Sequence, residues 1–266
     1  MKNILLLVHD DVGQEARLQV ALDLTRALGG HLSCVDVVEM YYQNDGMYGG
    51  GGTNVLLADE QAREDVNRMR LQARLGHEDV PWSWVDRIGD LAGCVTRAAG
   101  LADLIVVNRR LDNDVFDMAH VAASIAMETH KPVVAVPDTV RRFDVAGRAL
   151  IAWDGSMPAM TALCATLPLL QLAQAVQILE IDIAADAAPA EEAAEYLSRH
   201  EIHAEICRVS AQGKHADAII RRHATEYGAA YCVMGAYGHA RTIEALFGGV
   251  TRRMLHDSEI PLVLVH

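Results

Sequence analysis

The sequence repeats its own order of elements, and this repetition limits the folds that the 266 residues can adopt. The apolar runs "NILLLVHDD" and "RALIAWDGS" each end in an aspartate, Asp10 and Asp154, at an offset of 154 − 10 = 144. "LADLIVVNRR" matches "GAAYCVMGAY" at 234 − 107 = 127, and "HKPVVAVP" matches "EIPLVLVH" at 261 − 132 = 129. A period close to half the length of the chain indicates an internal duplication.

Each half alternates strand-like apolar runs with stretches of helical periodicity. The expected order is strand, helix, strand, helix, strand, helix, strand, helix, strand, which predicts a parallel sheet covered by helices on both faces. The chain is therefore expected to form two tandem doubly wound α/β domains, each a five-stranded parallel sheet flanked by helices. We place them at residues 1–140 and 147–266, joined by the polar segment 138–147.

Composition narrows the class of protein. Hydrophobic residues make up 51%, enough for two cores, and the net charge of 23 − 36 = −13 disfavours nucleic acid and acidic membrane surfaces as partners. The five cysteines are scattered without a CxxC pair, as in a reduced cytoplasmic protein. No apolar run approaches the length of a membrane span, and the first residues do not read as a signal peptide.

Parallel open sheets bind ligands outside the carboxyl ends of their strands, where the order of winding reverses. Asp10 and Asp154 end the first strand of their halves, and Asn108 and Gly235 end the fourth. These four positions are where we expect chemistry.

The second half carries the glycine-rich stretch "VMGAYGHARTIEALFGGVT", residues 233–251, with the spacing G-x2-G-x9-G. A strand ends near Met234, and Gly248, Gly249 and Val250 begin a short amphipathic helix. The first N–H groups of a helix are natural partners for phosphate oxygens. The spacing is neither G-x-G-x-x-G nor the Walker A pattern. The alternative interpretation is a tight strand-to-helix turn that needs small residues and binds no ligand.

The motif, together with "WDGS" after the first strand, resembles the universal stress protein family. The resemblance covers the chain as a tandem two-domain member, and it implies that the glycine motif holds ATP, with or without Mg²⁺. Asp154 would lie near the ribose or the metal, and the end of the second strand, near Ile181, would meet the adenine. The predicted cofactor-binding residues are Asp154, Ile181, Met234, Gly235, Gly238, His239, Gly248, Gly249, Val250 and Thr251.

The second half departs from the family pattern at one position. The family prefers Ser or Thr directly after the third glycine, and here Gly249 follows instead. Thr251 is close enough in sequence to supply a hydroxyl. Loss of one charge-assisted hydrogen bond corresponds to about 1.5–3 kcal/mol, or roughly ten- to a hundred-fold in affinity, so we expect weakened binding and not its loss.

The first half lacks this site. Asn108, Leu111 and Ala119 stand where the second half has Gly235, Gly238 and Gly248, so side chains are expected to fill the space that phosphates need. We predict that this half binds no ATP. "NRR", with Arg109 and Arg110, is either a receptor for another anion or a solvated charged turn.

Other motifs are weaker. The run Gly46–Gly52 follows a second strand and is typical of a mobile loop. His200 and His203, with His215 nearby, have zinc-binding residue types, but a strand is expected to begin at His203, and solvated polar residues are the simpler interpretation. Ser156 is interpreted as a helix N-cap. We identify no catalytic residue and no metal site.

The predicted function is therefore ATP binding by the second half in a stress or regulatory role, with at most slow hydrolysis. The two halves are expected to form a dimer within one chain, acting on an unknown protein partner, and association of two chains stays open. One alternative is a protein-interaction module with a vestigial site. Another is an adenylyl-transfer enzyme, although "WDGSMPAM" lacks the glycine pair of the usual SGGxDS-like loop.

Overall fold

The computed structural model describes residues 1–39, 52–109, 118–236 and 249–266; within these, the side chains of residues 39, 52–60 and 119 are not described. The first half contains the strands β1 (Asn3–Val8), β2 (His31–Glu39), β3 (Trp82–Gly89), β4 (Leu104–Asn108) and β5 (Val133–Val136). Its helices are α1 (Gln14–Leu28), α2 (Gly52–Leu75), α3 (Leu91–Ala98), the 3₁₀ turn η1 (Ala99–Leu101) and α4 (Met118–Thr129).

The second half repeats this order. Its strands are β6 (Arg148–Trp153), β7 (Ala175–Ile181), β8 (Ala204–Val209), β9 (Ala229–Gly235) and β10 (Leu262–Val265). Its helices are α5 (Met157–Ala165), α6 (Leu167–Leu170), α7 (Ala190–Ser198), α8 (Ala216–Tyr227) and α9 (Val250–Asp257). Residues 159–175 have the apolar spacing of a helical stretch. The structure has the shorter pair α5 and α6, which meet at Thr166 and begin at turns that contain Pro158 and Pro168.

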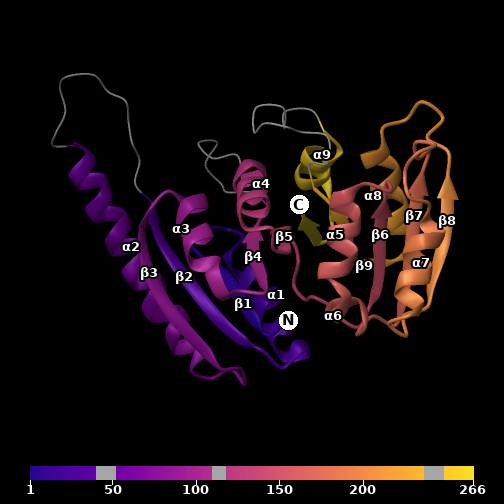
Figure 1. The fold of residues 1–266 in the computed structure, drawn as a ribbon. Helices are drawn as coiled ribbons and strands as arrows, with labels where there is room; N and C mark the ends of the chain where they lie inside the picture. The colour runs from indigo at the N-terminus through magenta and orange to yellow at the C-terminus, as the bar shows by residue number, and fades with distance from the viewer. Residues whose placement is uncertain (40–51, 110–117, 237–248) are drawn as a thin grey trace.

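The ten strands form one sheet in the order β3-β2-β1-β4-β5-β10-β9-β6-β7-β8. Within each half all neighbouring strands are parallel, as predicted. The two last strands, β5 and β10, pair antiparallel, with Val134 opposite Val263. The edge of one half therefore covers the edge of the other, which leaves β3 and β8 as the two ends of the sheet (Figure 1).

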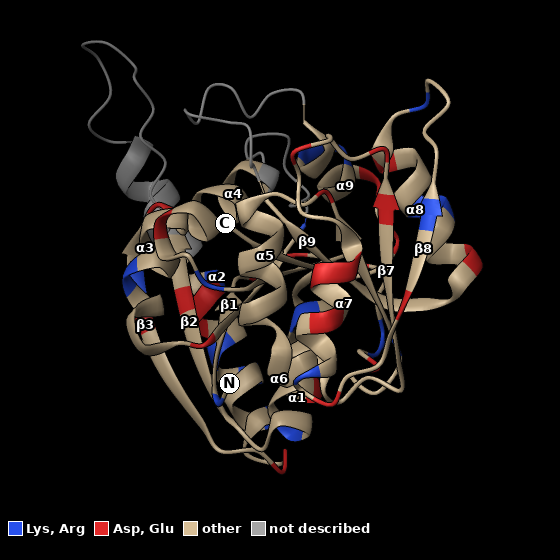
Figure 2. Cartoon of the chain, turned by 45° about the vertical axis from the view of Figure 1, so that its right-hand side comes forward, with Lys and Arg blue, Asp and Glu red and all other residues tan. Residues whose placement is uncertain are grey.

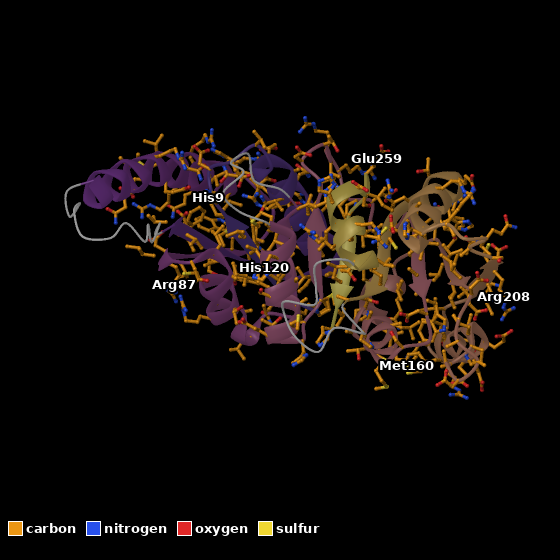
Figure 3. All side chains as sticks on the ribbon, turned by 90° about the horizontal axis from the view of Figure 1, so that it is seen from above. His9, Arg87, His120, Met160, Arg208 and Glu259 are labelled. Atoms are coloured by element: carbon orange, nitrogen blue, oxygen red, sulfur yellow. The ribbon has the colours of Figure 1, made fainter. Side chains whose placement is uncertain are left out.

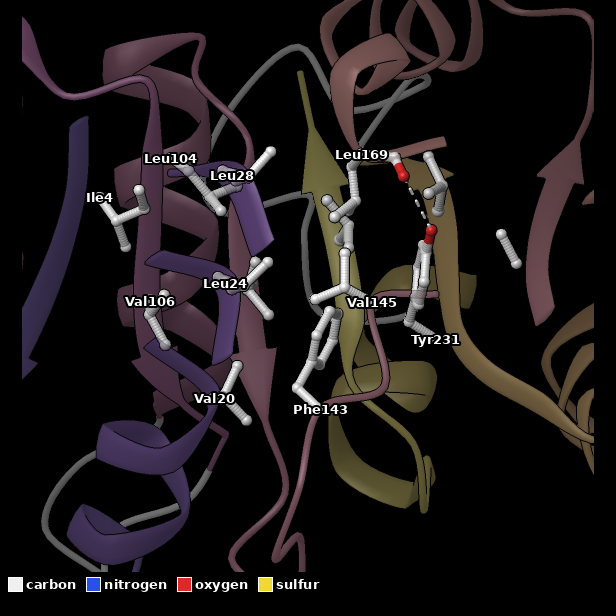
Figure 4. Close-up of a cluster of buried hydrophobic side chains, with 14 of the residues drawn as sticks. Ile4, Val20, Leu24, Leu28, Leu104, Val106, Phe143, Val145, Leu169 and Tyr231 are labelled. Atoms are coloured by element: carbon white, nitrogen blue, oxygen red, sulfur yellow. Dashed lines mark hydrogen bonds between the residues drawn. The ribbon is translucent and has the colours of Figure 1, made fainter. Parts of the chain in front are cut away.

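Helices cover both faces of the sheet, which confirms the doubly wound class. One core lies under α1, α2, α5, α6 and α7, and the other under α3, α4, α8 and α9. The segment that joins the halves is more than a polar linker, because Phe143 and Val145 are buried in the first core (Figure 4). The Phe143 ring stacks on Tyr231 with centroids 5.3 Å apart, so the connection helps to hold the halves together.

The sheet corrects the predicted register between the two first strands. Leu5 lies opposite Ile105 of β4, and Leu150 lies opposite Cys232 of β9. Since Ile105 and Cys232 match at the predicted offset of 127, β1 matches β6 at 150 − 5 = 145, one more than the sequence comparison gave. Leu5 and Leu150 also share one face of the sheet, whereas an offset of 144 would put matching side chains on opposite faces.

This shift changes which residues correspond at the strand ends. The first-half counterpart of Asp154 is His9, and Asp10 corresponds to Gly155 (154 − 9 = 155 − 10 = 145). The slip of one residue in the prediction has a physical cause. Strand β1 is buried on both faces after its first residue, so its sequence has no alternation of apolar and polar residues from which a register can be read.

Candidate functional site

The candidate site of the second half lies where strand order reverses. From β6 the chain winds outward to β7 and β8 and then returns to β9 on the other side of β6. The carboxyl ends of β6 and β9 therefore flank the switch point, the usual position of a ligand in such sheets. Ala152 pairs with Met234, so Asp154 and Gly235 stand at the ends of adjacent strands.

Asp154 is exposed at the end of β6, and its carboxylate accepts a 3.0 Å hydrogen bond from the Ser156 amide. The Ser156 hydroxyl in turn accepts a hydrogen bond from the Ala159 amide at 3.3 Å. Ser156 is therefore the N-cap of α5, as predicted. The turn between these residues is fixed by its own hydrogen bonds, while the outer side of the Asp154 carboxylate faces solvent.

The turn after β6 requires glycine at position 155. Gly155 has φ +70°, and a Cβ there would lie 2.5 Å from the carbonyl oxygen of Ala188. The same carbonyl accepts a 2.9 Å hydrogen bond from the indole of Trp153. The loop from β7 to α7 is thereby held against the end of β6. The sequence comparison had not assigned any role to Gly155 or to this loop.

Gly235 is also required by packing. A Cβ at this position would meet backbone atoms of α5, 2.5 Å from the Ala159 nitrogen and 2.7 Å from the Pro158 carbonyl carbon. Its φ lies outside the left-handed region, so glycine is needed for space and not for an unusual backbone conformation. The last residue of β9 thus sits directly against the first turn of α5.

The helix α9 begins after Gly249, which is its N-cap, with φ −79° and ψ 167°. In the described part of the chain, no side chain caps the helix there, and a Cβ on Gly249 would meet no atom within 4 Å. Beyond it, Val250 is half-buried and Thr251 is buried at 6% exposure, so the backbone is the part of this turn that a ligand can reach.

The remaining predicted residues divide into two groups. Ile181 is half-buried at the end of β7, and Met234 is buried at the end of β9. Gly238, His239 and Gly248 lie outside the described residues, as does the stretch Gly46–Gly51 of the first half. The structure thus brings Asp154, Met234 and Gly235 together on adjacent strands and places Gly249, Val250 and Thr251 at the start of the next helix.

The corresponding edge of the first half carries a buried polar cluster beside a pocket of about 360 Å³, which is lined by Asp10 and by residues of α1 and α2. His9 is 3% exposed (Figure 3), and its Nδ1 lies 2.9 Å from Oε1 of Glu64 on α2. The same carboxylate accepts hydrogen bonds from the Asp10 amide at 2.9 Å and from the Asn67 side chain at 3.0 Å. Asn67 also pairs with Gln14 of α1. We name His9, Asp36, Glu64, Asn67 and Gln14 the polar cluster.

Burial and neighbouring charges shift the pKa values of the carboxyl groups in the polar cluster. Burial raises the pKa of Asp36 to about 7, and Glu64 and Asp86 add to the rise, while Arg68 and His9 oppose it. Burial acts in the same direction on Glu64, but the hydrogen bonds from His9 and from the backbone hold its pKa below the usual value. Oδ1 of Asp36 is buried without a hydrogen-bond partner.

Of the first-half residues expected to block a phosphate, the structure describes one fully. Asn108 ends β4 and is 1% exposed. Leu111 and Arg110 lie outside the described residues, and Ala119 belongs to α4. Arg109 reaches across to the second half, where its guanidinium donates to the carbonyl of Ser258 after α9. Glu64 and Asn67 of the polar cluster come from α2, a helix that the sequence comparison did not connect with the site.

The histidines singled out from the sequence do not converge. His203 precedes β8, which begins at Ala204, and His200 packs its ring on Tyr196 with centroids 4.9 Å apart. Among the described residues, no group of three His, Cys, Asp or Glu side chains is arranged to hold a metal ion. All five cysteines are free, with Cys34, Cys94 and Cys232 buried.

The fold and the candidate site together define the class of protein. The chain is a tandem of two doubly wound α/β domains joined through their last strands, and in the second domain an exposed carboxylate and a helix start without a side-chain cap follow adjacent strands. No helix in the described part of the chain has the length and apolar character that crossing a membrane requires.

Comparison with known proteins then identifies the family. Residues 148–266 match the model of the universal stress protein family. The whole chain is 22% identical over 293 aligned residues to universal stress protein Slr1230 of Synechocystis, covering 99% of each. The second half, residues 148–266, is a universal stress protein domain, and the whole chain is similar over its length to a member of that family. The family model matches the half that retains the glycines.

Solved structures support the fold over the full length. A universal stress protein from Archaeoglobus fulgidus superposes with a TM-score of 0.76 at 14% identity, covering 99% of this chain and 96% of that one. Protein PA1789 of Pseudomonas aeruginosa, whose function is unknown, superposes with a TM-score of 0.55 at 16% identity, covering 100% and 92%. At these identities the likeness concerns the fold alone.

Proposed function

We propose that the second half binds ATP through backbone amides at the start of α9 and that the chain acts as a nucleotide-dependent stress or regulatory protein. The observation that carries the proposal is the open N-terminus of α9. Among the described residues, no side chain caps it and no atom lies within 4 Å of the position that a Cβ on Gly249 would take. Uncapped N–H groups and the positive end of the helix dipole favour a bound phosphate.

The surroundings of this helix support the same proposal. Asp154 presents an exposed carboxylate at the end of β6, where it can accept hydrogen bonds from a ribose or hold a magnesium ion bound to phosphates. Gly235 ends the adjacent strand and keeps the floor of the turn free of side chains. Ile181 ends β7 and can contact an adenine ring through its backbone and apolar side chain. Family membership of residues 148–266 adds to this case.

The proposal includes one nucleotide per chain. In the first half the position matching Asp154 holds His9, which is buried and paired with Glu64. A ligand that took the place of this pair would leave a buried charge without its partner, a change that costs several kcal/mol. The first half is therefore proposed to be a structural and regulatory partner of the binding half.

One observation favours a second candidate, a protein-interaction module with a vestigial site. Gly235, a residue of the glycine motif, is explained fully by the close approach of α5 and needs no ligand. Position 249 is also glycine where the family prefers a hydroxyl. The two candidates differ in their response to nucleotide, which makes them separable by experiment.

The test uses substitutions at Gly249, because a side chain fits there without strain. Gly249→Asp and Gly249→Asn both add good N-cap residues of almost equal size. If ATP binds at this turn, the aspartate should repel the phosphates and lower affinity by at least about ten-fold relative to asparagine. Neither variant should be less stable than the parent chain. Isothermal titration with Mg·ATP and a thermal melt of each variant measure both properties.

Two results would refute ATP binding at this turn. One is the absence of any heat or melting shift with Mg·ATP, Mg·ADP, cyclic AMP and NAD, which would favour the interaction module. The other is equal affinity of the Asp and Asn variants, which would place the nucleotide elsewhere. Turnover of a co-substrate during titration would instead indicate an enzyme.

A further inference from the structure

A groove lies between α5 and α7 on the outer face of the second half, away from the phosphate-binding turn proposed above. Its volume is about 530 Å³, within the range of small-molecule sites. We call it the α5–α7 groove; it is lined by Trp153, Met160, Leu163, Cys164, Glu192 and Tyr196, among others. Figure 2 shows the two helices side by side with acidic residues on α7, and Figure 3 labels Met160.

The matching helices of the first half, α1 and α2, also line a pocket, of about 360 Å³, but more polar contacts hold them together. There, α1 and α2 are joined by paired amides of Gln14 and Asn67, at 2.7 and 2.8 Å, and by the ion pair of Glu15 with Arg74. Between α5 and α7, the contact of the Tyr196 hydroxyl with the Cys164 thiol, which raises the pKa of Tyr196, is the one polar side-chain contact in the described part of the chain. Helix α7 has 9 residues against 24 in α2, so it covers less of the sheet.

The inner wall of the groove is apolar and firmly held. Leu163 and Trp153 are buried, at 2% and 4% exposure, and Met160 is half-buried. The indole N–H of Trp153 is already bonded to the Ala188 carbonyl, so the ring cannot turn away. A fixed wall of aromatic and aliphatic side chains suits the apolar body of a small ligand, because little ordering is needed on binding.

The rim of the groove is acidic. Glu195 forms an ion pair with Arg199 and is neutralised by it. Glu192 is exposed and, in the described part of the chain, forms no ion pair or side-chain hydrogen bond. One uncompensated carboxylate therefore stands beside an aromatic wall. This combination attracts a cation that carries an apolar group, through charge and through the faces of the aromatic rings.

We propose that the α5–α7 groove binds a small organic cation with an aromatic or aliphatic body and one ammonium group. The body lies against Trp153, Met160 and Leu163, and the ammonium group lies beside Glu192. The groove does not include Asp154, Gly235 or Gly249, so this site stands whether or not ATP binds at the turn.

The experiment follows binding through the fluorescence emission of Trp153. The chain has three tryptophans, so Trp82→Phe with Trp84→Phe leaves Trp153 alone. Titration with 2-phenylethylammonium at pH 7 should change its emission with saturation, whereas 3-phenylpropionate, an anion of similar shape, should not. Glu192→Gln should weaken the cation about two- to five-fold, the range of an exposed ion pair. Glu226→Gln, on α8, removes another exposed carboxylate and should change nothing.

A variant that fills the groove provides a second test of the proposal. Cys164 is exposed at the groove, so the larger side chain of Cys164→Trp can fill it. Circular dichroism checks that the variant is folded. Because the variant adds a second indole, its binding is measured by calorimetry and not by fluorescence. Loss of binding in this variant supports the site. Equal binding of cation and anion, unchanged affinity in Glu192→Gln, retention of binding in Cys164→Trp, or no saturable binding up to millimolar probe would each overturn the proposal.

Discussion

The two halves of this chain place different chemistry at the same edge of the same fold. In the second half, the end of β6 offers an exposed carboxylate, the end of β9 a glycine, and the start of α9 a bare helix terminus. In the first half, the matching strand ends carry the buried residues His9 and Asn108, and α2 inserts Glu64 and Asn67 over them. A duplicated scaffold therefore preserves strand order and packing while the strand-end residues diverge.

The comparison teaches that the same strand end can carry either an internal polar network or an exposed carboxylate. In the first half, charged and amide side chains pair with one another, at 2.9 Å between His9 and Glu64 and 2.7 Å between Gln14 and Asn67. Oδ1 of Asp36, in the same cluster, is buried without a hydrogen-bond partner. The charges of such a buried network make the stability of the first half depend on pH.

The largest expected effect is a loss of stability when a rise in pH ionises Asp36 in the polar cluster. The pKa of Asp36 rises from 3.8 to about 7 on folding, so the folded chain holds a proton that the unfolded chain releases between these values. Stability from this group is fully present below pH 4 and is lost as pH rises through 7, by about 3 kcal/mol between pH 5 and pH 8.5. Asp36→Asn should remove this dependence. Urea unfolding of both chains at pH 5 and pH 8.5 measures the difference.

Glu64 provides an internal check, because its pKa shift has the opposite sign. Its folded pKa is lowered, so its contribution is lost only as pH falls below its usual value of 4.5. Measurements above pH 5 therefore isolate Asp36. If the wild-type chain and Asp36→Asn lose stability in parallel between pH 5 and 8.5, the cluster does not hold the extra proton.

Much of this architecture was predictable from sequence. The repeat and the strand-helix alternation were sufficient to give two five-stranded parallel sheets. The N-cap role of Ser156 followed from its place before a helical stretch. Positions Asp154 and Gly235 followed from the rule that ligands meet carboxyl ends of strands. These features depend on local pattern, which a single sequence contains.

The features that were missed depend on contacts between distant segments. Glu64 and Asn67 sit on a helix whose polar residues look like a solvated face, and only folding shows that they point inward. Phe143 and Val145 lie in a segment that reads as a polar linker, yet they pack against Tyr231 and the core. The close approach of α5 to Gly235 likewise joins residues more than seventy positions apart.

The second prediction exchanges residues at matched positions. Gly235→Asn gives the second half the residue that the first half has at position 108. Its Cβ would meet the α5 backbone at 2.5 and 2.7 Å, and backbone cannot yield as a flexible side chain does. We expect a loss of about 2–3 kcal/mol in the free energy of unfolding, typical of an overpacked core. Thermal and urea unfolding without nucleotide measure it.

Gly249→Asn is the matched control, since the same side chain enters open space at the other end of the motif. It should leave stability unchanged or raise it slightly. Equal stability of Gly235→Asn and Gly249→Asn would mean that α5 does not pack on the end of β9 as the structure has it. The pair thus separates a glycine needed for packing from one that leaves room for a ligand.

The smallest expected effect comes from restoring the residue type that the family prefers at position 249. Gly249→Ser restores the hydroxyl that the family prefers and caps α9, which should add a few tenths of a kcal/mol to stability. If the turn binds ATP, the same hydroxyl should donate to a phosphate oxygen and raise affinity by up to about ten-fold. Gly249→Ala, which adds a Cβ without a hydroxyl, is the control for size. Titration with Mg·ATP should then rank Ser above Gly and Ala, and an affinity in Ser no higher than in Ala would show that the missing hydroxyl does not limit binding.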